Sequence, residues 1–225
     1  MGIDRNGFSE ETETRAYIPA LRFRFLTPIY DAAIAWALPE QRIKRALIAG
    51  TGESGPGRVL DVGCGTGTLT LMLKEEQPDA EVVGLDGDPE VLAVTRSKAG
   101  KAGVDLRLVE GMSYALAFED SSFDRVYSSL MIHHLKRDDK LRTFREVLRV
   151  LKPGGGFHLA DFGAPANPTM RLASFVVRRF EEAGDNVNGL LPRLMTDAGF
   201  PSVTGGERFN TLFGTIAIFR TTKPS

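Results

Sequence analysis

Cysteine is almost missing from this chain of 225 residues, since Cys64 is the only one. A single cysteine cannot form an intrachain disulfide, so a small disulfide-stapled scaffold is excluded. Histidine is also scarce, with three in the sequence, of which only His133 and His134 are adjacent. No cluster of His and Cys has the spacing that metal ligands need, so we expect no metal site.

The sequence also lacks an excess of either charge and any long apolar run. Lys and Arg number 28 against 29 Asp and Glu, a formal net charge of −1, which gives no electrostatic reason to expect nucleic acid. No run approaches the roughly 18 apolar residues of a membrane span, and residues 1–15 are too polar for a secretory signal. We expect a cytoplasmic monomer or homodimer whose partner is a small molecule.

The most informative segment present is the glycine-rich stretch VLDVGCGTGT, residues 59–68. An apolar run that predicts a strand ends there, and a helical pattern follows at once. Glycine lets a ligand approach the backbone closely, and α/β proteins bind nucleotides at such strand-to-helix turns. A nicotinamide site would have the spacing G-x-G-x-x-G, but Thr68 takes the third position and the extra glycine is Gly67. Asp61, just ahead of the loop, favours a ligand with a positive end over a pyrophosphate.

Strand and helix patterns alternate from residue 58 onward, which indicates a doubly wound α/β fold with a mainly parallel sheet. The expected strands are residues 58–62, 81–86, 105–109, 123–128, 157–161, 202–209 and 212–220, and the expected helices are residues 68–76, 140–151, 170–182 and 190–198, with another that starts after Asp88. Because only Asn210 and Thr211 separate the last two strands, we expect an antiparallel hairpin at the sheet edge. Pro153 and the three glycines after it are expected to end a helix before the fifth strand.

The chain divides into two predicted parts. Residues 1–50 are expected to form an N-terminal tail and a helical cap, because a helical pattern runs through their second half. Residues 51–225 are expected to form a single domain, a length that fits one α/β core. Within it, residues 163–189 follow the fifth strand at the edge where ligands bind, so a lid-like insertion is expected there.

Polar or small residues follow the second and third expected strands. A carboxylate at Asp86 can accept both hydrogen bonds of a ribose diol, and Gly87 leaves room for the sugar. Asp86 could instead cap the next helix, but Asp88 suits that role better. Met112 and Ser113 offer a flexible apolar side chain and a small polar one, which suit an adenine; an ordinary loop with Met112 in the core would explain them equally well.

Together these segments resemble the class I S-adenosylmethionine-dependent methyltransferases, over roughly residues 58–161. VLDVGCGTG is similar to the family's glycine-rich motif, VVGLDGDPEVL to its ribose-acid motif, FDRVYSSLMIHHL to its fourth-strand motif and LRVLKPGGGFHLADF to its fifth-strand motif. The segment FLTPIYDAAI and the overall layout are similar to the ubiquinone- and menaquinone-biosynthesis branch, which methylates small molecules. The resemblance implies a Rossmann-like seven-stranded sheet with a final antiparallel strand, in agreement with the predicted hairpin.

The resemblance also implies S-adenosyl-L-methionine as cofactor. The glycine loop would cradle its methionine portion, Asp61 and the region of Ser128 would face its amino-acid end, and Asp86 would bind the ribose hydroxyls. Many members carry an acid in the stretch that would flank the adenine, and this chain has none there. The implied cofactor-binding residues are Asp61, Gly63, Cys64, Gly65, Gly67, Asp86, Gly87, Met112, Ser113, Ser128, Ser129 and His133.

The function implied is methyl transfer by in-line displacement to a small, partly apolar acceptor, and the sequence leaves open whether a carbon, oxygen or nitrogen is methylated. A base is needed only if the acceptor loses a proton. His133 and His134 are the candidates because histidine titrates near neutral pH, and Asp161, at the end of the fifth strand, and Tyr30 are weaker catalytic candidates. His133 could instead pack against the cofactor, and Tyr30 could close over it.

Two other functions stay open at this point. A non-catalytic cofactor-binding protein would carry the same motifs. A nicotinamide-dependent oxidoreductase is opposed by the residue at position 68, where the dinucleotide motif has glycine.

Overall fold

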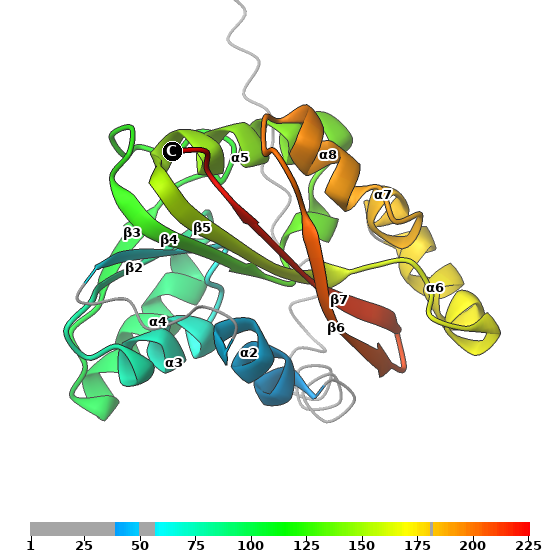
Figure 1. The fold of residues 1–225 in the computed structure, drawn as a ribbon. Helices are drawn as coiled ribbons and strands as arrows, with labels where there is room; N and C mark the ends of the chain where they lie inside the picture. The colour runs from blue at the N-terminus through cyan, green and yellow to red at the C-terminus, as the bar shows by residue number, and fades with distance from the viewer. Residues whose placement is uncertain (1–38, 50–56, 181) are drawn as a thin grey trace, which may run out of the picture.

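The computed structural model describes residues 39–49, 57–180 and 182–225, and in these residues one sheet lies between layers of helices (Figure 1). The elements are, in chain order, α2 (Glu40–Ala49), β1 (Arg58–Val62), α3 (Thr68–Glu76), β2 (Glu81–Asp86), α4 (Pro89–Ala102), β3 (Arg107–Glu110), β4 (Phe123–Ser129), the 3₁₀ turn η1 (Ile132–His134), α5 (Arg137–Val150), β5 (Leu151–Phe162), α6 (Pro168–Phe180), α7 (Gly184–Val187), α8 (Leu191–Asp197), β6 (Thr204–Thr211) and β7 (Gly214–Thr222).

The sheet has seven strands in the order β3-β2-β1-β4-β5-β7-β6. Strands β1 to β5 pair in parallel, β7 is antiparallel to β5, and β6 is antiparallel to β7. The chain first adds strands on one side of β1 and then crosses to β4 on the other side, so β1 and β4 flank the point where the order reverses. The predicted doubly wound, mainly parallel sheet of seven strands with an antiparallel C-terminal hairpin is confirmed. Ligands bind such sheets outside the carboxyl ends of the strands, at the point where the order reverses.

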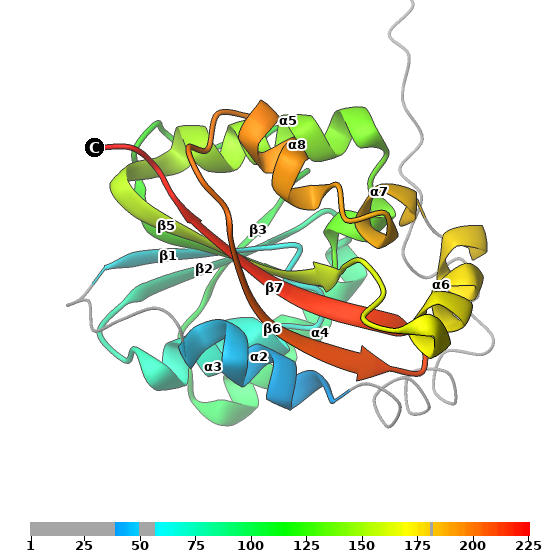
Figure 2. The same cartoon turned by 45° about the vertical axis from the view of Figure 1, so that its right-hand side comes forward.

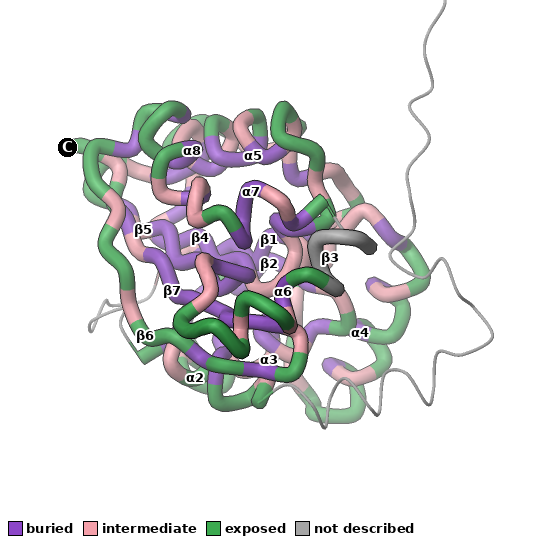
Figure 3. Tube along the Cα trace, turned by 90° about the vertical axis from the view of Figure 1, so that its right-hand side faces the viewer, coloured by how far each residue is buried: buried purple, intermediate pink, exposed green. Residues whose placement is uncertain are grey.

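Helices cover both faces of the sheet, with α5 and α8 on one face and α2, α3 and α4 on the other (Figures 1 and 2). Successive strand residues point to opposite faces, so Leu60 packs with Phe144 of α5 while Val59 packs with Ile43 of α2 and Leu69 of α3. The strands β1, β2, β4, β5 and β7 are therefore mostly buried, whereas the edge strands β3 and β6 are largely exposed or half-buried (Figure 3). Among the described residues, no helix is both long and apolar enough to cross a membrane.

The helix α4 forms as the sequence predicts, because both of its ends carry strong local signals. The carboxylate of Asp88 accepts the N–H of Glu90 at 2.8 Å, and Pro89 occupies the first helical turn. Gly103 ends the helix with φ of 66°, a conformation that glycine adopts without strain. Of the predicted cap in residues 1–50, the structure describes α2, whose Ile43 is fully buried on the sheet. The division of the chain into cap and domain stays a prediction.

Several predicted boundaries differ from the structure, and the two errors next to β7 have clear physical causes. The hairpin turn is Leu212-Phe213 rather than Asn210-Thr211, because the Thr211 hydroxyl accepts the N–H of Phe213 at 3.1 Å and donates to the carbonyl of Gly214 at 2.8 Å. The glycines after Pro153 do not precede β5 but lie within it, since their backbone exchanges hydrogen bonds of 3.0 and 2.9 Å with Lys223 beyond the end of β7.

Candidate functional site

The glycine-rich loop follows β1 at the carboxyl edge of the sheet. Gly63, Gly65 and Gly67 have φ of 72°, 53° and 77°, a region that is costly for residues with a side chain. A Cβ on Gly63 would lie 2.2 Å from Cγ of Met131, and a Cβ on Gly67 would lie 2.2 Å from Cγ2 of Thr95. A Cβ on Gly65 would meet nothing within 4 Å. Packing within the protein thus requires glycine at positions 63 and 67, whereas the backbone at position 65 faces space that a ligand can enter.

Hydrogen bonds from β2 and α4 fix the tip of this loop. The N–H of Gly65 donates to Oδ2 of Asp86 at 2.8 Å, and the hydroxyl of Thr95 donates to the carbonyl of Gly65 at 2.8 Å. The other carboxylate oxygen of Asp86 accepts the N–H of Asp88 at 3.0 Å, across the half-buried turn at Gly87. Each carboxylate oxygen has two lone pairs, so Asp86 can still accept one hydroxyl group on each.

Asp61 lies at the end of β1 beneath the loop and is 1% exposed. It accepts a hydrogen bond from the hydroxyl of Thr70 at 2.7 Å. Burial raises the pKa of Asp61 to about 6, and the Asp86 charge adds to the rise, while the Thr70 hydroxyl and the Lys44 charge oppose it. Above that pH the site holds a buried anion, which costs stability in the free protein and favours a cationic ligand.

Asp61→Asn should stabilise the protein more at high pH than at low pH. Because the folded-state pKa of Asp61 lies above its ordinary value of 3.8, the folded protein holds this proton more tightly and loses stability as the pH rises from about 4 to about 6. Asparagine keeps an acceptor for Thr70 without that loss, so the gain over wild type should reach about 3 kcal/mol at pH 8 and roughly half of that at pH 5. Urea unfolding of both proteins at the two pH values measures the difference. An equal gain at both would contradict the raised pKa.

The thiol of Cys64 is buried inside the loop, with Sγ 3.8 Å from the carbonyl oxygen of Gly65. Burial raises its pKa, and the charges of Asp61 and Asp86 raise it further. The thiol therefore stays protonated and contributes volume rather than a nucleophile.

The residues predicted to flank an adenine follow β3. Met112 is half-buried, and Ser113 is buried with its hydroxyl 3.0 Å from that of Thr143 on α5. The hydroxyl of Ser113 thus already has a partner in the protein, and contact of these two side chains with an adenine stays a prediction.

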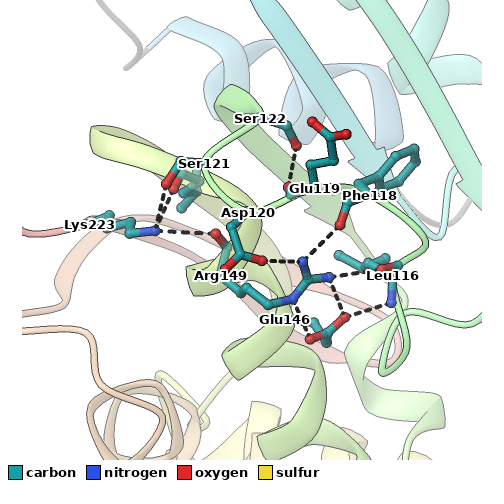
Figure 4. Close-up of polar contacts among 10 residues, drawn as sticks. Leu116, Phe118, Glu119, Asp120, Ser121, Ser122, Glu146, Arg149 and Lys223 are labelled. Carbon is teal, nitrogen blue, oxygen red and sulfur yellow. Dashed lines mark hydrogen bonds and ion pairs between the residues drawn. The ribbon is translucent and has the colours of Figure 1, made fainter.

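Arg149 of α5 binds the second half of the loop that connects β3 to β4 (Figure 4). Its guanidinium donates to the carbonyls of Leu116 and Phe118 at 2.8 Å each and to the carboxylate of Asp120 at 2.7 Å. Glu146 accepts from Arg149 at 2.9 and 2.8 Å and from the N–H of Leu116 at 2.8 Å. This clamp holds the loop between β3 and β4 against the helix layer.

Strand β4 ends in Ser128 and Ser129, next to the end of β1. The hydroxyl of Ser128 donates to the carbonyl of Val62 at 2.9 Å and ties the two strand ends together. The Oγ of Ser129 is buried and has no hydrogen-bond partner among the residues that the structure describes. A buried hydroxyl rarely stays unpaired, so this atom marks a position where a polar ligand group would complete the hydrogen bonding.

Asp161, at the carboxyl end of β5, is fully buried and accepts four hydrogen bonds. Its Oδ2 accepts the N–H of Ile132 at 2.8 Å. Its Oδ1 accepts from Nδ1 of His133 at 2.9 Å, from the N–H of Phe162 at 2.7 Å and from the side-chain amide of Asn186 at 3.0 Å. Burial alone would raise its pKa, but the charge and hydrogen bond of His133, with the N–H of Phe162, hold it below the usual range.

The ionised carboxylate fixes the state of the His133 ring. Because a carboxylate can only accept, Nδ1 of His133 carries a proton, and in the neutral form of the ring Nε2 holds a lone pair that can take up another. Phe162 packs edge-on against this ring at 4.9 Å, and the exposed ring of His134 lies against it at 4.0 Å between centroids. Of the two predicted histidines, the structure therefore gives His133 the buried and oriented position.

The segment after β5 is fastened to α5 as well as to Asp161. Asp185 of α7 forms an ion pair with Arg137, and Lys140, which is fully buried, lies 3.8 Å from the same carboxylate. The ammonium of Lys140 also donates to the carbonyl of Glu182 at 2.6 Å. Burial lowers the pKa of Lys140, and the charge of Asp185 counters that shift.

The structure thus brings Asp61, the three glycines, Asp86, Ser129 and His133 to one edge of the sheet. Tyr30, also predicted, lies outside the described residues. Sequence reasoning missed Thr95 and Asn186, and no motif marks either of them. Asp161 had a usable signal, because it is the acid that ends the fifth strand.

Comparison with known proteins agrees with this geometry. The family model described as a methyltransferase domain matches residues 59–155. A demethylmenaquinone methyltransferase of Thermus thermophilus is 42% identical over 113 residues, which cover 50% of each chain. One from Listeria monocytogenes is 33% identical over 162 residues, 70% of this chain and 67% of the relative. The chain thus spans about half the length of the first curated relatives that it matches.

Solved structures share the fold at low sequence identity. The YcgJ protein of Bacillus subtilis superposes with a TM-score of 0.69 at 19% identity, over 82% of this chain and 99% of that one. Phosphoethanolamine N-methyltransferase 2 of Haemonchus contortus, in complex with S-adenosyl-L-methionine, gives 0.67 at 20% identity, over 82% of this chain and 53% of that one.

Proposed function

Because the chain belongs to the class I S-adenosylmethionine-dependent methyltransferases, of the menaquinone and ubiquinone type, we propose that it transfers a methyl group from S-adenosyl-L-methionine to a small, partly apolar quinol. The observation that carries the proposal is the cradle at Gly65, where a backbone without a side chain borders open space beside the carboxylate of Asp86. The quinol ring as acceptor is supported by the relatives named demethylmenaquinone methyltransferases.

The described residues fit this cofactor. Asp86 has free lone pairs for the two ribose hydroxyls, and the open backbone at Gly65 lets the methionine portion approach the loop. The buried anion at Asp61 suits the ammonium of the amino-acid end, and the unpaired hydroxyl of Ser129 can bond to the same end. A pyrophosphate would instead bring negative charge toward Asp61, which argues against a nicotinamide dinucleotide.

When bound, the cofactor supplies an electrophilic methyl group on a sulfonium. The protein's part is to align the acceptor in line with that methyl and to exclude water, which can lower the barrier by several kcal/mol. A quinol ring carbon that gains a methyl must lose its own proton. His133 can take that proton at Nε2, since Asp161 holds Nδ1 protonated and stabilises the imidazolium that forms.

We propose that the segment 163–189 covers the acceptor. It leaves β5 beside Asp161 and returns through α7, where Asn186 bonds to the same carboxylate. We expect it to act as the lid of the site. The cytoplasmic location, the monomeric or dimeric state and the absence of a nucleic-acid partner stay predictions.

A transfer assay tests the function directly. Purified protein is incubated with methyl-radiolabelled S-adenosyl-L-methionine and a panel of demethylated naphthoquinols, phenols and amines. Label should pass to the quinols, and the transfer should depend on their reduced form, because the reduced ring is the better nucleophile. Cofactor binding without transfer to any acceptor would instead support a non-catalytic cofactor-binding protein.

Asp86→Asn should weaken cofactor binding at least tenfold. Both oxygens of Asp86 accept backbone N–H groups, so an amide would point its NH₂ group at one of these donors and lose an acceptor for the ribose. Calorimetric titration with S-adenosylhomocysteine measures the affinity. Asp88→Asn is the matched control, because asparagine caps a helix as well as aspartate does. Equal affinities of the two variants would overturn the assigned role of Asp86.

A further inference from the structure

Asn186 of α7 extends its side chain to the carboxylate that orients the candidate base. The residue is fully buried, and its Nδ2 donates to Oδ1 of Asp161 at 3.0 Å. The same oxygen accepts the hydrogen bond from Nδ1 of His133 at 2.9 Å. The amide and the imidazole ring therefore meet on one oxygen atom, so a displacement of the amide changes the hydrogen bonding of the atom that holds the ring.

The oxygen Oδ1 of Asp161 is crowded with donors. Besides Asn186 and His133, it accepts the N–H of Phe162 at 2.7 Å. A carboxylate oxygen has about two lone-pair sites, so three donors on one oxygen restrict each other's positions. Phe162 pairs with Ile216 of β7, and the sheet therefore fixes the direction of its N–H. The amide of Asn186 thus limits the directions from which the ring of His133 can approach.

The stability of the fold does not account for an asparagine at this position. The Oδ1 of Asn186 is buried and has no hydrogen-bond partner among the residues that the structure describes. A buried polar atom without a partner costs free energy, which an apolar side chain of similar shape would avoid. Asp161 would still accept three hydrogen bonds without the amide. The amide is therefore better explained by its effect on Asp161 and His133 than by packing.

The residue before Asn186 fastens α7 to a different element. The carboxylate of Asp185 accepts from Nε of Arg137 at 3.1 Å, and Arg137 begins α5, which follows η1 in the chain. Helix α7 also packs beside β5, which carries Asp161, and beside η1, which carries His133. The position of α7 thus decides whether the amide of Asn186 reaches Oδ1.

We propose that Asn186 is a positioning residue, which aligns the ring of His133 through Asp161 when α7 is docked on β5. The inference rests on the proposed function, because the ring needs one fixed orientation only if it takes a proton from the acceptor. When α7 leaves β5, Oδ1 loses a donor and the ring gains freedom on it. The base is then aligned only when the segment 163–189 covers the site, which couples proton transfer to the exclusion of water.

Steady-state kinetics of Asn186→Leu tests the alignment. Leucine keeps the branched shape of asparagine but has no donor. The kcat should fall by about tenfold to 100-fold, because a misplacement of about 1 Å can cost two orders of magnitude in rate. The KM for the quinol and the affinity for S-adenosylhomocysteine should change little, because neither binding site is altered. Asn186→Ala removes the donor without adding volume and replaces the leucine variant if that protein does not fold.

Val187→Ala is the matched control in the same helix. Val187 is 5% exposed and lies in an apolar cluster with Ile216, so alanine weakens the packing of α7 without removing a donor to Asp161. Asp185 and Asn186 still hold the helix in place, so this variant should lose stability and keep its kcat. An equal fall of kcat in Val187→Ala and Asn186→Leu would attribute the effect to loosening of the segment and overturn the positioning role. A rise of KM without a fall of kcat in Asn186→Leu would do the same.

A double variant tests whether Asn186 acts through the ring. In a His133→Gln background the ring is gone, so Asn186→Leu should lower kcat little further, because residues that act as a unit are not additive. A further fall as large as that in the wild-type background would place the action of Asn186 elsewhere and overturn the proposal.

Proton NMR supplies a readout that does not depend on methyl transfer. The proton on Nδ1 of His133 is donated to Asp161 in a residue that is 7% exposed, so we expect it to give an observable signal. The signal should shift or vanish in Asn186→Leu and stay in place in Val187→Ala. An unmoved signal in Asn186→Leu would overturn the proposal. A moved signal in a protein that transfers no methyl group would support the alignment while contradicting the proposed function.

Discussion

Gly65→Ala should abolish cofactor binding in a protein that still folds. A Cβ at this position meets nothing within 4 Å of the protein, so the fold should lose only the cost of φ near 53° in a residue with a side chain, about 1 to 2 kcal/mol. The same methyl group would project into the space through which the methionine portion of the cofactor reaches the loop. We expect calorimetry with S-adenosylhomocysteine to detect no binding.

Gly63→Ala is the comparison that separates folding from binding. Its Cβ would lie 2.2 Å from Cγ and 2.7 Å from Cβ of Met131, and the second of these atoms is too close to the backbone to move aside. Overpacking adds about 1 to 3 kcal/mol to the backbone strain, so urea unfolding should show Gly63→Ala to be clearly less stable than Gly65→Ala. Similar stabilities for the two variants, or normal cofactor affinity for Gly65→Ala, would contradict the geometry of the cradle.

Local signals made most of the fold predictable. The strand Glu81–Asp86 and the helix Thr68–Glu76 agree with the expected bounds, because an apolar run, glycine and proline mark their ends within a few residues. The start of β5 was misplaced because a partner distant in the sequence determines it, whereas the last turn was misplaced because local bonds of the Thr211 hydroxyl set it two residues later. Gly155 pairs with Lys223, and only the folded sheet reveals that the glycines continue a strand.

In the candidate site, too, local motifs were predictable from the sequence, whereas contacts between distant residues were not. The glycines and Asp86 were found because the cofactor loop is a contiguous motif with one acid at a fixed distance. Asn186 was missed because its contact with Asp161 spans 25 residues, and Lys140 because its contact with Glu182 spans 42 residues. A side chain that acts through a carboxylate on another element leaves no periodic pattern in the sequence.

Met131 connects the two halves of the site. Its side chain packs against Gly63 in the cofactor loop, and η1 with His133 follows it directly in the chain. The packing that demands glycine at position 63 therefore also sets the position of the predicted base relative to the cofactor. A substitution at Gly63 would therefore disturb the position of His133, next to the methyl acceptor, as well as the cofactor loop.

His133→Gln should lower kcat by about 100-fold to 10,000-fold and leave the affinity for S-adenosylhomocysteine within threefold of wild type, if the ring acts as general base. Glutamine can still bond to Asp161, so the buried carboxylate keeps a partner and the fold should survive. Steady-state kinetics measures kcat, and calorimetric titration with S-adenosylhomocysteine measures the affinity.

His134→Gln is the matched control for this prediction. Its ring lies 4.0 Å from that of His133, yet it is exposed, and the four hydrogen bonds described above for Asp161 come from other residues. A base must be held by its partner with one nitrogen protonated and the other aimed at the acceptor, and only His133 meets the first condition. A loss of rate in His134→Gln equal to that in His133→Gln would assign the proton transfer to the pair rather than to the oriented ring. Unchanged rates in both would mean that the acceptor needs no base.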